Sequence, residues 1–400
     1  MIKAIQNPCN IYFTLWCFYL LQGTLYESGS TISQLLLLVI LCISLKDAIK
    51  VNMMKGLPVY FKGLNAMVIM YTIYWIVLLM TDGLTFMRQI GTEVSSLNYL
   101  RTAYYSLLPI YSCYYYTVKG YFRSDNYKKW VLIFVIIAIV EYFRIQRELV
   151  QLYMEAGSDR TEFTNNIGYM LLLLTPCAFI FNKKPKIQFF VYGICLLFVM
   201  LSMKRGAMLI AFVALLVFLY DKTKLISAKR KTIFFFVVIL VFILLYFLFK
   251  EMLINSLYFQ ERINETLEGD SSGRDEIYSA LLHHFFHDAN VFQMFFGMGA
   301  EGTVKIFRAW AHNDWIEILT NQGVLGIFVF SFYWLAFRYN CLNKRLSLEA
   351  RFALKYLFII FFLRTLFSMS ITDMNIYSSS MMGYALADGF KRDFYNNKKV

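Results

Sequence analysis

Long apolar runs alternate with short polar segments along the whole chain of 400 residues. A helix needs roughly 20 apolar residues to cross about 30 Å of hydrocarbon, and a dozen runs meet or approach this length. They cover about 9–26, 31–47, 64–81, 98–117, 130–147, 166–182, 187–203, 206–220, 232–250, 314–337, 354–370 and 375–390. The pattern predicts an all-α, polytopic membrane protein with about twelve transmembrane helices.

The seventh and eighth runs lie close together, with Lys204 and Arg205 between them. One continuous helix over both runs would be about 50 Å long at 1.5 Å per residue, which is too long for a single crossing. We therefore expect a tight turn at residues 202–206 and a separate helix on each side of it.

The composition supports a membrane location. The chain is 59% apolar and 16% charged, whereas soluble domains are about 45–50% apolar and about 25% charged. The net charge of +13 would suggest a nucleic-acid partner in a soluble protein. Here the basic residues cluster between the apolar runs, where they determine topology, so we expect no nucleic-acid partner. The seven cysteines show no CxxC spacing, which indicates neither a disulfide framework nor a zinc site.

The charges also orient the chain. With the N-terminus in the cytoplasm, about two-thirds of the 39 Lys and Arg residues fall in inward segments, and most of the 26 acidic residues fall outside. Positive residues favour the cytoplasmic side, so both termini are predicted there. The chain then divides into spans one to nine (1–250), one larger outward loop (251–313), and three further spans with a short cytoplasmic tail (314–400). Within the loop, 275–296 has the apolar spacing of an amphipathic surface helix.

Several polar residues mark the start of the tenth span, which is costly unless they are paired or serve a site. His312 is the natural general base, since its ordinary pKa lies near neutrality. Asp314 and Glu317 are three residues apart and would share one helix face. A structural alternative makes Asn313 or Asp314 the N-cap, with Glu317 as its reciprocal partner and Trp315 in the interfacial aromatic belt.

Two cations at the outward turn 202–206 depart from the positive-inside bias. Lys204 and Arg205 stand there beside Gly206 and the N-terminal end of the eighth helix. Together these groups would bind a phosphate or pyrophosphate. The alternative is that both long side chains extend to the membrane interface.

Two further arginines are candidates for the same anion. Arg274 follows Gly273 in the outward loop and could clamp a phosphate from across Arg205, or pair with the acidic residues that follow it. Arg364 lies inside the eleventh span, where an arginine is by default functional, although Asp373 could serve as its partner.

A metal site is not predicted. His283 and His287 have the i, i+4 spacing of two ligands on a helix, but no third ligand accompanies them. The chain also has no nucleotide-binding fingerprint, so no cofactor is expected.

Four pieces in order resemble the O-antigen ligase / Wzy polymerase superfamily, most densely from about 195 to 335. They are Ser202–Ala207 (SMKRGA), Ser272-Gly273-Arg274, Gly297-Met298-Gly299, and His312-Asn313 followed by Glu317-Ile318-Leu319 and Gly323-Val324-Leu325-Gly326.

This resemblance implies a metal-independent glycosyltransferase of GT-C-like fold in the bacterial inner membrane, acting at the periplasmic face on an undecaprenyl-pyrophosphate-linked oligosaccharide. By position, His312 would be the catalytic base. Arg205 and Arg274, with Lys204, would hold the pyrophosphate. The remaining substrate-binding candidates are Arg262, Arg364, Asn313, Asp314 and Glu317.

The acceptor separates three possible functions. A polymerase transfers to another lipid-linked repeat, and a ligase transfers to lipid A–core. Arg262 and Gly273 have the Arg–ten–Gly spacing of polymerase outer loops, and the moderate loop without an extra soluble domain also favours a polymerase. A flippase or other transporter should carry charges near the midplane of both halves, whereas here they gather at the outer face of the C-terminal half. Membrane lipids, a flippase and a chain-length regulator are candidate partners.

Overall fold

The computed structural model describes residues 7–89, 92–155, 163–225, 227–267 and 273–397. In chain order its elements are α2 (Pro8–Leu20), α3 (Thr31–Asn52), α4 (Tyr60–Thr81), β1 (Thr85–Gln89), β2 (Thr92–Ser95), α5 (Leu97–Leu107), α6 (Pro109–Val118), α7 (Ser124–Glu155), α8 (Ile167–Leu174), η1 (Thr175–Phe181), α9 (Pro185–Leu201), α10 (Arg205–Leu225), α11 (Ala228–Asn255), α12 (Leu257–Leu267), α13 (Arg274–His283), η2 (His284–Asp288), α14 (Val291–Phe296), α15 (Gly302–Phe307), α16 (Asp314–Cys341), α17 (Leu348–Phe367), η3 (Ile371–Asp373) and α18 (Ile376–Asn397).

The helices support the prediction of a helical membrane protein. Within the described ranges, five are long and apolar enough to cross a bilayer, namely α3, α4, α10, α16 and the part of α11 from Phe234 to Asn255. The apolar helices Ile167–Phe181 and Pro185–Leu201 are shorter. Each of the predicted spans coincides with a helix or a pair of helices, but twelve crossings and a GT-C-like fold stay predictions.

Proline accounts for two places where a predicted span is divided. The fourth run forms α5 and α6, which meet at Pro109, and the sixth passes from α-helix to 3-10 helix just before Pro176. Proline has no N–H to donate to the preceding turn, so a regular helix rarely continues through it. The predicted turn between the seventh and eighth runs is confirmed, since α9 ends at Leu201 and α10 begins at Arg205.

Two features of the segments between the long helices differ from the sequence prediction. The strands β1 and β2 form an antiparallel hairpin after α4, in a chain predicted to be all-α. The continuous amphipathic helix expected over 275–296 is wrong, because the segment is divided into α13, the π-helical turn η2 and α14. Asn290 causes the last division, since its side chain caps α14 and forms a reciprocal capping box with Gln293.

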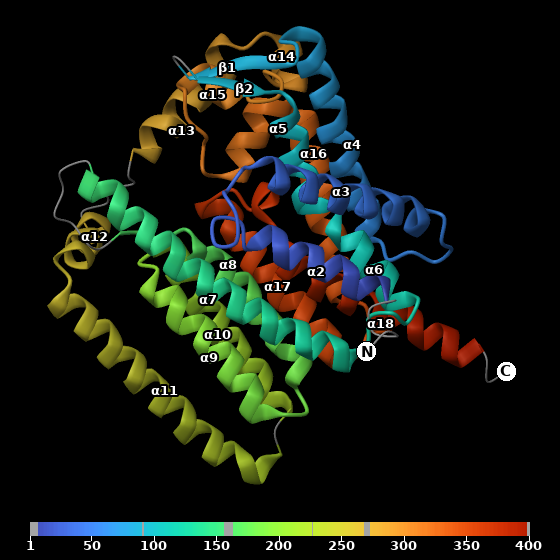
Figure 1. The fold of residues 1–400 in the computed structure, drawn as a ribbon, viewed down its shortest axis with the longest axis vertical. Coiled ribbons are helices and arrows are strands. Elements are labelled where there is room, and N and C mark those ends of the chain that lie inside the picture. Colours follow the sequence, from blue (N-terminus) through green and yellow to red (C-terminus); the bar gives the residue numbers. More distant parts are fainter. Residues whose placement is uncertain (1–6, 90–91, 156–162, 226, 268–272, 398–400) are drawn as a thin grey trace.

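The β-hairpin and the short helices α13 to α15 lie together at one end of the molecule. Figure 1 shows β1, β2, α13, α14 and α15 grouped at the top of the view beside α5 and α16, with both chain termini away from this group. The helix α11 runs along the left edge, next to α9 and α10. The most apolar stretch of α11 has none of its described side chains buried in the protein, which fits a surface that faces lipid.

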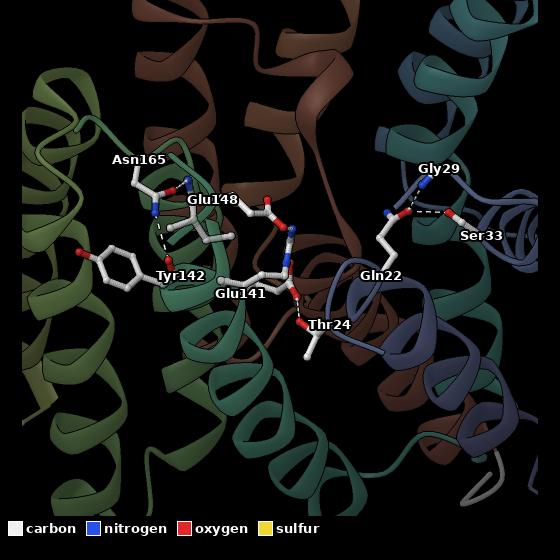
Figure 2. Close-up of polar contacts among 10 residues, drawn as sticks. Gln22, Thr24, Gly29, Ser33, Glu141, Tyr142, Glu148 and Asn165 are labelled. Carbon is white, nitrogen blue, oxygen red and sulfur yellow. Dashed lines mark hydrogen bonds and ion pairs between the residues drawn. The ribbon is translucent and has the colours of Figure 1, made fainter. Parts of the chain in front are cut away.

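The loop between α2 and α3 is fastened to α7. The Thr24 hydroxyl donates to Glu141 Oε1 at 3.1 Å, and Gln22 Oε1 accepts a hydrogen bond from the Ser33 hydroxyl at 2.5 Å (Figure 2). Arg144 forms ion pairs with both Glu141 and Glu148, at 2.5 and 2.6 Å. This network links the loop between α2 and α3 to α7.

Candidate active site

A cavity of about 490 Å³ opens between several of the helices. Its lining comes from α4, α5, α8, the α9–α10 turn, the segment before α16, α16 itself and the loop between α17 and α18. The lining residues used below are Asn98, Tyr99, Arg101, Tyr169, Lys204, Glu301, Trp310, His312, Asp314, Glu317, Asn321 and Gln322. Elements from both halves of the chain therefore build one site.

His312 faces this cavity from the short segment that joins α15 to α16. Its backbone is left-handed, with φ of 52°, and Arg308 at the start of the same segment also has a positive φ, of 63°. A non-glycine residue in this region is strained, and such strain persists only where the surroundings enforce it. The fold therefore imposes the direction in which the imidazole points.

The residues on either side of His312 supply that constraint. Ala311 is fully buried and its N–H donates to Glu317 Oε2 at 2.9 Å. Asn313 caps α16, since its side-chain oxygen accepts hydrogen bonds from the backbone N–H groups of Trp315 and Ile316 at 2.9 and 3.3 Å. The Asn313 capping alternative is thus observed, but Glu317 reaches Ala311 and not the N-cap residue.

The two carboxylates of α16 bind the protein itself. Glu317 Oε1 accepts hydrogen bonds from Thr303 at 2.6 Å and Asn321 at 2.9 Å. Asp314 Oδ2 accepts the backbone N–H groups of Ser370 and Ile371 at 2.8 and 3.2 Å. Both carboxylates line the cavity, and both tie its walls to the first turns of α16.

Trp315 is half-buried, and its interfacial role stays a prediction. Its indole N–H donates to the Thr365 hydroxyl at 3.0 Å, and its ring packs against Phe330 at 4.7 Å between centroids. The first contact joins the start of α16 to α17, and the second joins the two parts of α16.

Lys204 enters the cavity from the α9–α10 turn, and Tyr169 lies beside it. The Lys204 ammonium stands 5.9 Å from the centre of the Tyr169 ring, and the Arg364 guanidinium stands 4.4 Å from the same ring. Arg364 is fully buried in α17. Gly206 gives the ring its place, because a Cβ there would overlap the Tyr169 hydroxyl. The fold therefore brings two of the predicted cations, Lys204 and Arg364, against the Tyr169 ring.

The turn that carries Lys204 is held from α7 and α8. The Asn165 amide donates to the Tyr142 carbonyl at 3.2 Å (Figure 2), while the Asn165 backbone N–H donates to the Ser202 carbonyl at 2.9 Å. Gly168 packs directly against the Ser202 side chain. Lys204 is therefore presented by a fixed turn and not by a free loop.

Arg274 lies near the histidine but outside the cavity lining. It begins α13 after Gly273, whose φ is 74°, and it donates to the Phe367 carbonyl at 3.1 Å. Burial, followed by the positive charges of Arg274 and Lys204, lowers the pKa of His312. A lowered pKa keeps the imidazole neutral near pH 7, which is the state a general base requires.

The other predicted cations lie elsewhere. Arg205 is 3.8 Å from Glu265 in α12, in an ion pair outside the cavity lining. Arg262 belongs to α12, but its side chain lies outside the described residues, as does that of Asp373. Ser272 also falls outside the described ranges. The structure therefore places His312 and Lys204 at the cavity. Arg364 is buried against the lining residue Tyr169, Arg274 lies nearby, and Arg205 is not part of this group.

Sequence reasoning missed several lining residues. Arg101 was one of the outward basic residues and could have been singled out by the same departure from the positive-inside bias. Tyr99, Glu301, Trp310 and Gln322 carry no comparable signal, because only the packing of distant segments brings them to the cavity.

A break in α16 explains the Gly297-Met298-Gly299 segment. Gly323 has φ of 66° inside α16, so the helix is interrupted there. The carbonyl groups of Thr320 and Asn321 accept hydrogen bonds from Met298 and Gly299 at 2.8 and 3.0 Å. This segment forms a turn whose N–H groups bind carbonyl groups next to the break.

No metal centre is indicated in the part of the chain that the structure describes, where no three His, Cys, Asp or Glu side chains are grouped for an ion. His283 and His284 both approach Asp288, at 3.6 Å. The cavity itself presents a histidine and a lysine side by side in its lining.

Comparison with known proteins supports the resemblance given by the sequence motifs. A family model described as O-Antigen ligase matches residues 190–331, which run from α9 into the second half of α16. No curated protein matches the chain.

Proposed function

We propose that this protein is a polysaccharide polymerase of the bacterial inner membrane, since a family model described as O-Antigen ligase matches residues 190–331. It would transfer a glycan from undecaprenyl pyrophosphate to a lipid-linked repeat unit at the periplasmic face. The observation that carries this proposal is the position of His312, whose neutral imidazole shares a cavity with Lys204.

The proposed reaction is a single displacement at the anomeric carbon of the donor glycan. The acceptor hydroxyl oxygen forms a bond to that carbon while the bond from carbon to phosphate oxygen breaks, and the pyrophosphate leaves with the electron pair. His312 takes the hydroxyl proton. Lys204, Arg364 and Arg274 supply fixed positive charge that would stabilise the departing anion, so the reaction has no need of a nucleotide site.

The environment of Lys204 also suits a lipid-linked substrate. An apolar groove of about 280 Å³ runs between α9, α10 and α11, and it begins at Met208, one turn after Arg205. Its lining contains only apolar and tyrosine side chains, among them Phe212 and Phe242. A polyprenyl chain in this groove would leave its pyrophosphate at the outer end of α10, next to the cations.

A ligase that transfers to lipid A–core is the second candidate, because the matching family model carries that description. We favour the polymerase on the spacing of Arg262 and Gly273. Both activities would use the same base and the same cations, and they differ in the acceptor alone.

The test is His312→Ala in the native host, with His287→Ala as the matched control. His287 lies in η2, outside the cavity lining. Loss of long glycan with single repeats still attached to core supports the polymerase. Loss of all glycan from core supports the ligase. Normal polymer in the His312 variant would refute both, provided that His287→Ala behaves like the parent protein.

A further inference from the structure

One face of α16 forms a polar wall of the cavity. Asp314, Glu317, Ile318, Asn321 and Gln322 all line the space, at the i, i+3, i+4, i+7 and i+8 positions that share one side of a helix. The wall begins beside His312 and ends at the Gly323 break. It therefore extends away from the base toward Tyr99 of α5.

Gln322 differs from the other polar residues of this wall. Asp314, Glu317 and Asn321 hold backbone or side-chain groups of the protein. Gln322 is only 1% exposed, and its amide N–H donates to the Tyr99 hydroxyl at 2.9 Å. Its Oε1 accepts no hydrogen bond from any described residue. A buried acceptor without a partner is unfavourable, and a bound donor would supply what is missing.

The backbone of Gln322 is held by its neighbours, so the unpaired Oε1 does not result from a poorly packed segment. The Gln322 carbonyl accepts a hydrogen bond from Tyr74 at 3.2 Å. The following residue, Gly323, packs so closely that a Cβ would lie 2.5 Å from the Gly297 nitrogen. The Tyr99 hydroxyl then fixes the amide from the other side.

The surroundings of Gln322 suit sugar hydroxyls and not an anion. Glu301 acts electrostatically on Tyr99, is buried, and accepts the Trp310 indole N–H at 3.3 Å. An amide, a carboxylate and aromatic rings are the usual combination for neutral polar ligands. A carboxylate would repel the pyrophosphate of the donor, whose cations lie around His312.

We propose that Gln322, together with Tyr99 and Trp310, forms the subsite for the acceptor sugar, with Gln322 Oε1 accepting a hydrogen bond from a sugar hydroxyl. This inference rests on the proposed function and names the part of the cavity that the acceptor occupies. His312 then stands between the acceptor and the cations, as a base that deprotonates the acceptor hydroxyl should.

The experiment measures transfer in proteoliposomes that contain the full-length protein. The donor is the lipid-linked repeat unit isolated from cells lacking the protein. The acceptor is an alkyl glycoside of the same repeat, which has no pyrophosphate and so can accept but not donate. Gln322→Met keeps the side-chain volume and removes both amide groups. We expect the KM for the alkyl glycoside to rise about tenfold, while the KM for the donor and the kcat at saturating acceptor change less than twofold.

Two further variants keep the test decisive. Gln188→Met is the matched control, because Gln188 is a buried glutamine outside the cavity lining. Tyr99→Phe removes only the hydroxyl that holds the amide, and we expect it to raise the same KM by a smaller factor. This variant carries the test if Gln322→Met prevents folding. An unchanged acceptor KM in both cavity variants, or an equal rise in the donor KM, overturns the subsite. If His312→Ala abolishes transfer at the same time, the proposed function survives that result.

Discussion

Glu317 should act on transfer through the backbone that orients His312. Its Oε2 accepts the Ala311 N–H at 2.9 Å, and its Oε1 accepts Thr303 and Asn321. Glu317→Gln keeps the shape and one oxygen. The remaining oxygen can serve Thr303 and Asn321, but the new NH₂ group then faces the Ala311 N–H. Two donors oppose each other, and the N–H of a fully buried residue loses its partner.

The size of the effect follows from that lost hydrogen bond. A buried donor without a partner costs about 1–3 kcal/mol. The neighbouring His312 is held at φ of 52°, and the segment releases this strain when its anchor weakens. The same free energy then reduces the fraction of molecules with the imidazole in place. Because about 1.4 kcal/mol corresponds to a tenfold change in rate, we expect kcat to fall about 5- to 150-fold.

The assay is transfer by purified protein in proteoliposomes, with thermal unfolding in detergent as the check on folding. Glu276→Gln is the matched control, because Glu276 is an exposed residue of α13. A Glu317→Gln protein that unfolds at the parent temperature and retains more than half of the parent kcat would show that Glu317 does not position His312.

Three further predictions concern the same cavity. The lowered pKa of His312 means that activity persists below pH 6.5 and is lost when the imidazole gains a proton. Since Arg274 helps to lower this pKa, Arg274→Gln should move the acidic limb of the kcat/KM profile to higher pH. An acidic limb at the parent pH would contradict the assignment of His312 as the base. Gly206→Ala should displace Tyr169 and reduce transfer about tenfold or more. The double variant with Tyr169→Phe, which lacks the overlapping hydroxyl, should recover part of the lost activity. Equal activities of the single and double variants would refute the steric cause. Gly323→Ala places a Cβ at a residue with a positive φ, where it would overlap backbone atoms. Backbone strain of roughly 1–3 kcal/mol should lower the midpoint of thermal unfolding in detergent by several degrees. An unchanged midpoint would contradict the tight packing at the break.

The positions of the helices could be predicted from the sequence because the bilayer imposes a long apolar pattern that needs no knowledge of neighbours. The interruptions were less visible. Pro109 and Pro176 are local signals, whereas the break at Gly323 depends on contact with the distant Gly297 turn. The division of 275–296 arose from one capping residue, Asn290, within an otherwise helical pattern.

The candidate site could be predicted in part for a related reason. His312 and Lys204 are conspicuous because polar groups at the end of a membrane helix are unfavourable in free energy. That signal can be recognised from one segment of the sequence alone. Gln322 and Glu301 cost little in an isolated sequence. They become candidates only when folding buries them beside a cavity whose walls come from seven parts of the chain.

The interruption of α16 at Gly323 also separates two mechanical roles within one helix. The first turns, Asp314 to Gln322, are bound to Thr303, to Ser370 and to the Gly297 turn. The part after Gly323 lies among the membrane helices. Helices adapt to bilayers of different thickness by tilting. We expect the part of α16 after Gly323 to tilt, while the first turns keep their direction. Reconstitution in thinner or thicker bilayers should then alter stability more than turnover.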